Sequence, residues 1–201
     1  RLPRRMVVGR AIWQFGLSIS ILAAGLAAGK QDVALVYSPP LPLGLAAWGI
    51  RRLRGTPFVL NVQDLFPQSV IDLGLLRNRR AIKLFEGMER FLYSKADAIT
   101  VHAESNADHV VSKGAASRRV SAVPNWVDTT AISADGSGRA FRDRHGLGDE
   151  FVVSFAGVLG HSQDLEVVLD AAGLLKENAD IRWVIVGDGV RKRGLEELAA
   201  K

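Results

Sequence analysis

Short apolar runs alternate along the chain with longer stretches whose apolar residues recur at helical spacing. The short runs end at Pro, Gly or polar residues, as buried parallel strands do. Strands are predicted at 32–38, 57–62, 97–102, 119–128, 151–157 and 181–189. Helices are predicted at 41–55, 81–96, 104–114, 164–178 and 190–201. This alternation predicts right-handed crossovers and parallel sheets.

A polar stretch interrupts the alternation at 129–139, where Gly and Ser residues occur and the apolar period is lost. Such a segment is typical of a linker. We therefore expect an α/β protein with two Rossmann-like parallel-sheet domains, both incomplete in this chain. The expected parts are a first domain at 1–128, a linker and lead-in at 129–148, and a second domain at 149–201. The last predicted helix looks unfinished, which favours a fragment of a longer protein.

The segment 11–29 carries no charge over 19 residues, and arginines precede it at positions 1, 4, 5 and 10. Its length is that of a membrane span, but Gln14 and several Gly and Ser residues dilute its apolar character. Three interpretations stay open: a buried helix of the α/β domain, a helix on a membrane surface, and a span. The buried helix needs the fewest assumptions.

The overall charge changes the picture of possible partners. The chain of 201 residues has a formal net charge of +5, so phosphates or an anionic membrane surface are plausible partners. It has no cysteine, which excludes disulfides and Cys-ligated metals and is compatible with a reducing compartment. No nucleic-acid partner is expected, and the expected location is cytoplasmic, with peripheral contact to the inner membrane as an option.

Ligands of open parallel sheets bind beyond the carboxyl ends of the strands. The residues that directly follow the predicted strands are therefore the candidate site. They are Ser38, Pro39, Pro40, Gln63, Asp64, His102, Pro124, Asn125, Trp126, the segment 157–163, and Gly187 to Gly189.

Two of these segments suit a diphosphate. In the segment 157–168, Gly157 and Gly160 allow backbone amides to approach an anion, and a helix is expected to start near Ser162. A plain turn explains the glycines equally well. After the strand at 181–189 comes a basic triplet, Arg191, Lys192 and Arg193, which is either a solvated face or the source of one charge for a phosphate.

Other chemistries find little support. His102 and His109 lack further ligands at metal spacing, so no metal site is predicted. The chain has no G-x-S-x-G elbow and no Walker A loop. The G-x-G-x-x-G fingerprint is also absent, which argues against an NAD-dependent enzyme.

Five motifs follow one another along the chain: "VQDLFPQS", "FEGMERFLYSKADAITVHAES", "VPNWVD", "VVSFAGVLGHSQDLEVVLDAA" and "WVIVGDG". In this order and spacing they resemble glycosyltransferase family 4 over nearly the whole chain. The resemblance is strongest to the bacterial branch that transfers amino- or deoxy-sugars in O-antigen and capsule assembly. It implies the GT-B fold, with an N-terminal acceptor domain and a C-terminal nucleotide-sugar domain.

The resemblance also implies roles for single residues. Gln63 and Asp64 stand where relatives carry a catalytic-site pair, His or Arg followed by Asp. The donor contacts it implies are Gly157, Val158, Gly160, Gln163, Gly187, Gly189 and Lys192. Ser38, Pro39, Asn125 and Trp126, which follow predicted strands, would line the acceptor site or the cleft. Val158 departs from the family pattern, and the paired glutamates that hold the donor would lie beyond Lys201.

The implied reaction is transfer, with retention, of a sugar from a UDP-linked donor to a lipid-linked glycan acceptor, with no cofactor and no metal. This chain alone is expected to be inactive, because half of the donor site is missing. A GT-B sugar-nucleotide epimerase and a degenerate copy that only binds a partner remain alternatives. Asp64 would either contact a sugar or orient the loop that follows it through backbone hydrogen bonds.

Overall fold

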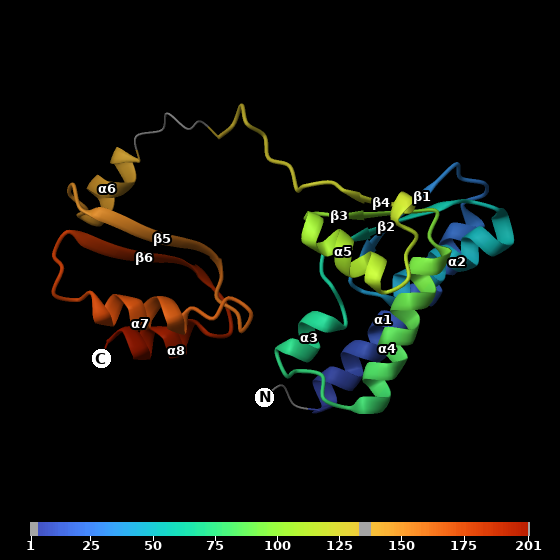
Figure 1. Ribbon diagram of the computed structural model, residues 1–201, viewed down its shortest axis with the longest axis horizontal. Helices are drawn as coiled ribbons and strands as arrows, with labels where there is room; N and C mark the ends of the chain where they lie inside the picture. The colour runs from blue at the N-terminus through green and yellow to red at the C-terminus, as the bar shows by residue number, and fades with distance from the viewer. Residues whose placement is uncertain (1–3, 133–137, 201) are drawn as a thin grey trace. The chain divides into compact units, whose positions relative to one another are not determined.

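The computed structural model describes residues 4–132 and 138–200, and the chain divides after Trp126 into two compact units. Unit 1 contains four parallel strands in the order β1-β2-β3-β4 (Figure 1). Their bounds are β1 Ala34–Ser38, β2 Phe58–Val62, β3 Ala98–Val101 and β4 Val120–Ala122. The parallel α/β class predicted from the hydrophobic pattern is confirmed.

The helices of unit 1 connect these strands and begin and end at recognisable signals. Their bounds are α1 Arg4–Ala27, α2 Pro42–Arg54, α3 Gln68–Asp72, α4 Arg79–Lys95, α5 Glu104–Ser112 and a 3₁₀ turn at Ser117–Arg119. Gly55 ends α2 with a left-handed φ of 75°. Asn78 caps α4, because its side chain accepts hydrogen bonds from the amides of Arg80 and Ala81.

The core of unit 1 lies on one face of the sheet. Alternate residues of β2, namely Phe58, Leu60 and Val62, are buried and pack against Leu92 and Tyr93 of α4. Side chains of β1 that point to the other face are open: Leu35 is 72% exposed and Tyr37 57%. Figure 1 shows the helices gathered on a single side of the strands.

Helix α1 is half covered. Its packed side contacts α2, where Gly25 faces Ile50 and Gly49 faces Leu22. A Cβ at either glycine would collide with the opposing side chain, so these two glycines allow the close approach. The interpretation of a buried helix therefore holds for one face only. Within the described part of the chain, no helix is long and apolar enough to cross a membrane.

Unit 2 is a smaller layer of two parallel strands and three helices. Its elements are α6 Arg139–His145, β5 Phe151–Val158, α7 Glu166–Leu174, β6 Ile181–Asp188 and α8 Lys192–Ala199. The buried residues are Leu159, Leu165 and Leu195. The helix α6 lies where only a linker and lead-in were predicted, and residues 133–137 of that linker lie outside the described residues.

Two helices of unit 2 begin later than predicted. The helix expected near Ser162 begins at Glu166, because Asp164 has a φ of 45° and that left-handed conformation cannot belong to a right-handed helix. The next helix begins at Lys192, since Gly189 has a φ of 155° and the chain turns before it coils. Gln163 is therefore in a turn, and Lys192 opens its helix.

Candidate functional site

The carboxyl ends of β5 and β6 come together through glycines. Gly157 is paired with Gly187, and Val158 with Asp188. A Cβ on Gly187 would overlap the carbonyl oxygen of Gly157, and one on Gly189 would overlap that of Leu159. Only glycine fits at 187 and 189, so these two residues let the backbone of β6 and its loop approach that of β5 and its loop closely.

In the loop after β5, the side chain of Gln163 accepts hydrogen bonds from two residues of the same turn. The amide N–H of Gly160 donates to Oε1 of Gln163 at 3.2 Å, and the Ser162 hydroxyl donates to the same oxygen at 3.1 Å. Ser162 and Gln163 are exposed, so an incoming group can displace the Gln163 side chain at little cost. Val158, which is 66% exposed, adds no polar atom here.

The basic triplet divides into three different environments. Arg191 forms an ion pair with Glu166, which opens α7. Arg193 is paired with Glu197 one turn further along α8, at 3.0 Å. Lys192 is exposed at the first position of α8 and has no ion pair with any described residue. Sequence reasoning did not foresee the two glutamate partners, which leave Lys192 as the available cation of the three.

The carboxyl edge of unit 1 brings Ser38 and Gln63 together. The Gln63 amide donates to the Ser38 carbonyl at 2.9 Å, and the Gln63 side chain donates to Asn61 Oδ1 at 2.8 Å. Ser38 itself is 3% exposed, which leaves Pro39 as the half-buried neighbour at this end of β1. Gln63 keeps its side chain on the same face as Asn61.

Asp64 is exposed, and its carboxylate serves the following loop. Its Oδ2 accepts from the Ser69 hydroxyl at 3.2 Å, and its carbonyl accepts from the Phe66 amide at 2.8 Å. The orienting contact predicted for this residue is thus made by the side chain of Ser69, in α3, together with Asp64's own backbone. One carboxylate oxygen is left with no such contact.

The other strand ends are level with Gln63. Val62 pairs with Val101, and Val101 with Ala122. His102 therefore follows β3 at the same level of the sheet at which Gln63 follows β2. Nε2 of His102 lies 3.5 Å from Nδ2 of Asn106. Asn125 and Trp126 follow β4 and are exposed, Trp126 by 86%. Among residues 4–132 and 138–200, no group of three His, Asp or Glu side chains is arranged to hold a metal ion.

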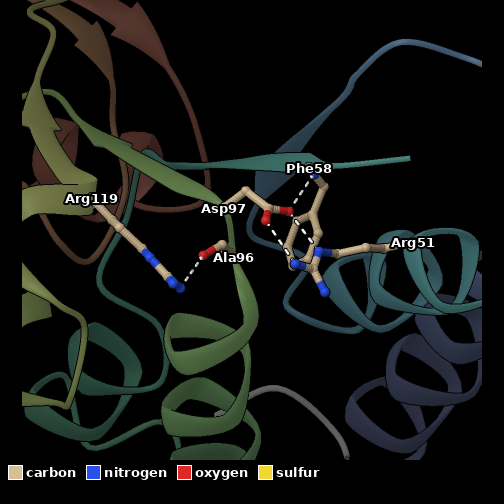
Figure 2. Close-up of polar contacts among 5 residues, drawn as sticks. All are labelled: Arg51, Phe58, Ala96, Asp97 and Arg119. Carbon is tan, nitrogen blue, oxygen red and sulfur yellow. Dashed lines mark hydrogen bonds and ion pairs between the residues drawn. The ribbon is translucent and has the colours of Figure 1, made fainter. Parts of the chain in front are cut away.

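At the amino-terminal ends of the strands of unit 1, Asp97 forms a cluster of hydrogen bonds that sequence reasoning missed (Figure 2). We call this cluster the clamp. Arg51 donates from Nε and Nη2 to the two oxygens of Asp97, at 2.7 and 2.8 Å, and the Phe58 amide donates to Asp97 Oδ2 at 3.1 Å. Beside it, Arg119 donates to the Ala96 carbonyl at 3.1 Å. The segment "ADAIT" therefore supports the fold, away from the candidate site. Its sequence signal is an acid directly before a strand.

Comparison with known families decides the assignment of this chain. Residues 2–126 match the family described as the glycosyl transferase 4-like domain. The chain belongs to this family. The match covers unit 1, so the strand ends with Ser38, Gln63, Asp64 and Asn125 all lie within the glycosyl transferase 4-like domain.

Two curated relatives extend the likeness into unit 2. The chain is 29% identical over 168 residues to the putative colanic acid biosynthesis glycosyl transferase WcaI of Escherichia coli K12, covering 79% of this chain and 41% of WcaI. It is 26% identical over 179 residues to the probable glycosyltransferase WbjE of Pseudomonas aeruginosa, covering 86% and 44%. The chain thus spans less than half the length of these relatives.

Solved structures agree on the fold. HepE of Anabaena with UDP and glucose superposes with a TM-score of 0.66 at 14% identity, over 90% of this chain and 46% of HepE. HepE has also been solved with UDP-glucose. The lipopolysaccharide outer core galactosyltransferase WaaB in its apo form gives a TM-score of 0.51 at 13% identity, over 100% and 47%. The likeness to these structures confirms the predicted GT-B fold class.

Proposed function

We propose that this chain is part of a glycosyltransferase that moves a sugar, with retention, from a UDP-linked donor to a lipid-linked glycan in cell-surface polysaccharide synthesis. Membership of the glycosyl transferase 4-like family and the names of WcaI and WbjE support the transfer reaction. The binding of UDP and UDP-glucose by HepE supports the donor class. Unit 2 is the donor side of this proposal, and unit 1 the acceptor side.

The arrangement at the carboxyl edge of unit 2 carries the proposal. Gln163 Oε1 accepts from the Gly160 amide and the Ser162 hydroxyl, so a carbonyl oxygen occupies a position suited to a phosphate oxygen. Lys192 stands unpaired at the first turn of α8, beyond the neighbouring strand. A diphosphate would replace the Gln163 contact and gain the charge of Lys192.

In the proposed reaction, the bond between the anomeric carbon and the diphosphate oxygen breaks, and its electron pair leaves with the diphosphate. The acceptor hydroxyl oxygen bonds to the anomeric carbon from the same face, and its proton passes to the departing phosphate oxygen. Loop amides and Lys192 would stabilise the negative charge that develops on the leaving group. Gln63 would orient the sugar through hydrogen bonds from its amide group.

The first test measures donor binding to the chain by ligand-observed NMR, which detects weak complexes, with UDP and UDP-glucose as probes. We expect binding, and we expect Lys192→Ala to weaken it by about ten- to a hundredfold, because one charge-assisted contact is lost. Arg193→Ala is the matched control, since Arg193 is already paired with Glu197 and should matter little.

Three outcomes would contradict parts of this assignment. If Arg193→Ala weakens binding more than Lys192→Ala, the wrong cation has been placed at the phosphate. If neither probe binds, unit 2 is not a donor site in this chain. Equal binding by wild type and both variants would mean that loop amides alone hold the phosphates.

A further inference from the structure

Helix α1 has one face that no described residue covers. Its packed face meets α2, and the stripe at Ile12, Gly16, Ile19, Ala23 and Ala27 lies on the opposite side at helical spacing. Ile12 is 68% exposed, Ile19 70%, and the adjacent Trp13 63%. Single exposed apolar residues are ordinary, but a continuous apolar stripe on a long helix indicates a contact surface.

The polar atoms on this face are satisfied within the helix. The hydroxyl of Ser20, which is exposed, donates to the Gly16 carbonyl at 3.1 Å. Between Ile12 and Ala27 the exposed face carries no charged side chain at all. Interfaces with a particular protein usually place polar and charged groups around an apolar centre. A surface without them suits a partner that offers hydrocarbon and no fixed hydrogen-bonding pattern.

Basic residues lie near both ends of α1. The sequence places Arg4, Arg5 and Arg10 in its first part. At its other end, Arg54 of α2 is exposed and donates from Nη2 to the Leu26 carbonyl at 2.8 Å, with Arg52 also exposed and Lys30 just beyond. Asp32 is the nearby acid.

The two units also differ in formal charge. Residues 1–126 hold 17 of the 26 Lys and Arg but 8 of the 21 Asp and Glu, a formal charge of +9. Residues 127–201 hold the other 9 basic and 13 acidic residues, a formal charge of −4. The unit that carries the apolar helix is therefore the strongly basic one, so an anionic surface would attract it selectively.

We propose that α1 is the membrane-docking element of this protein, with the stripe from Ile12 to Ala27 buried in the interface of an anionic lipid bilayer. The helix lies in the plane of the membrane, and α2 covers the side that faces away from lipid. Trp13 sits at headgroup depth, as aromatic side chains of interfacial helices do. Arg52 and Arg54, beside the end of the helix, contact acidic headgroups, and the arginines that the sequence places near its start add positive charge. The proposal does not depend on the transfer reaction.

Flotation with vesicles tests the proposal. The 201-residue chain should float with vesicles of phosphatidylcholine and phosphatidylglycerol, and less with phosphatidylcholine alone. High salt should reduce the binding, because it screens the headgroup charges. The double variant Ile12→Asp and Ile19→Asp should lose at least about tenfold in partitioning, since two large apolar groups no longer transfer into lipid. Leu84→Asp, at a leucine of α4 that is 58% exposed, is the control and should bind as wild type does.

A second readout locates the helix directly. Lipids brominated in the upper acyl chain should quench the tryptophan fluorescence of the wild type, and Trp13→Phe should remove most of that quenching while still floating. The proposal is overturned if the double variant floats like wild type, or if wild type fails to float with anionic vesicles. It is also overturned if light scattering shows a dimer that the double variant dissociates, because the face would then join two copies.

Discussion

At the scale of single residues, the carboxylate of Asp97 ties three segments together at the amino-terminal edge of the unit 1 sheet. The hydrogen bonds from Arg51 lower the pKa of Asp97 below its ordinary value, and the Phe58 amide acts in the same direction against the opposing effect of burial. Both side chains are about a third exposed, so solvent screens part of their attraction. The clamp is therefore a moderate contribution that depends on ionisation.

We predict that Asp97→Asn lowers the free energy of unfolding at neutral pH by about 1–2 kcal/mol, because a bidentate charge-assisted contact is lost. A carboxyl group with a lowered folded pKa stabilises fully above its ordinary pKa and loses that stabilisation as the pH falls. The two proteins should therefore converge in acid. Urea unfolding at neutral and acidic pH measures this, with Asp108→Asn, at an exposed acid, as the control. A constant difference at all pH values would contradict it.

Glu89 presents the opposite case. It is fully buried on α4, where the Tyr93 hydroxyl interacts with its carboxyl group without full hydrogen-bond geometry, and His109 Nε2 of α5 lies 3.7 Å away. Burial raises the pKa of Glu89, and the charge of Lys113 and the Tyr93 hydroxyl only partly oppose it. Burial also lowers the pKa of His109. The fold thus favours the neutral form of both groups.

We predict that Glu89→Gln becomes more stable relative to wild type as the pH rises from acid to neutral. Because the pKa of Glu89 is raised in the fold, the folded wild type keeps a proton that the unfolded chain has lost. Its stability therefore falls as the pH rises from the ordinary pKa of glutamate to the raised pKa of Glu89. Glutamine has no such proton. Chemical unfolding across this range tests the prediction, with Glu104→Gln, at an exposed residue of α5, as the control. A parallel course for Glu89→Gln and wild type would disprove it.

At the scale of elements, the start of α5 is under-stabilised. Ala103 is its N-cap, with an extended φ of −144°, and it offers no side-chain acceptor to the first amides of the helix. The other long helix of this region, α4, is capped by Asn78. The two helices pack on the same core, so they differ in the N-cap residue and not in their surroundings.

Ala103→Ser should therefore raise the free energy of unfolding by about 1 kcal/mol, because the serine hydroxyl can accept from the free amides of the first turn. Ala103→Val, which fits the extended backbone but cannot cap, should bring no such gain. Thermal unfolding of the three proteins compares them. A stabilisation by valine as large as that by serine would show that capping is not the cause.

At the scale of the whole molecule, the two units have cores of very different size. Unit 1 buries side chains from three strands and three helices, whereas unit 2 buries Leu159, Leu165 and Leu195 over two strands. A two-stranded layer with so few buried side chains is marginal by itself. The two parts should therefore differ in stability.

We expect the amides of β5 and β6 to exchange with solvent much faster than those of β2 and β3, because unit 2 opens at a lower free energy. Native-state hydrogen exchange read by mass spectrometry measures this strand by strand. On heating, the fluorescence of Trp183, isolated by replacing the other three tryptophans with Phe, should change before the far-ultraviolet signal of unit 1. Equal protection in both pairs of strands would contradict the prediction.

The sequence by itself determined the elements and their class. Alternating apolar runs and helical periods are local properties, so the parallel strands, the Gly55 cap and the helix at 81–96 could be read from neighbouring residues. The candidate loops followed as well, because a strand's carboxyl end is a position along the chain. Asp164 escaped this reasoning, since no pattern predicts a left-handed conformation at a residue other than glycine, and α7 therefore begins four residues later than expected.

Only the tertiary structure decided which residues meet across the chain. Arg51 and Asp97 are 46 positions apart, and Glu166 and Arg191 belong to different helices, so no local period announces either pair. These contacts pair Arg191 and Arg193 with glutamates and leave Lys192 without an ion pair among the described residues, a distinction that composition could not make. The same holds for α1, whose apolar residues surround the helix in sequence. Packing against α2 covers one side and leaves the other open, because burial depends on what lies opposite a residue and not on the residue alone.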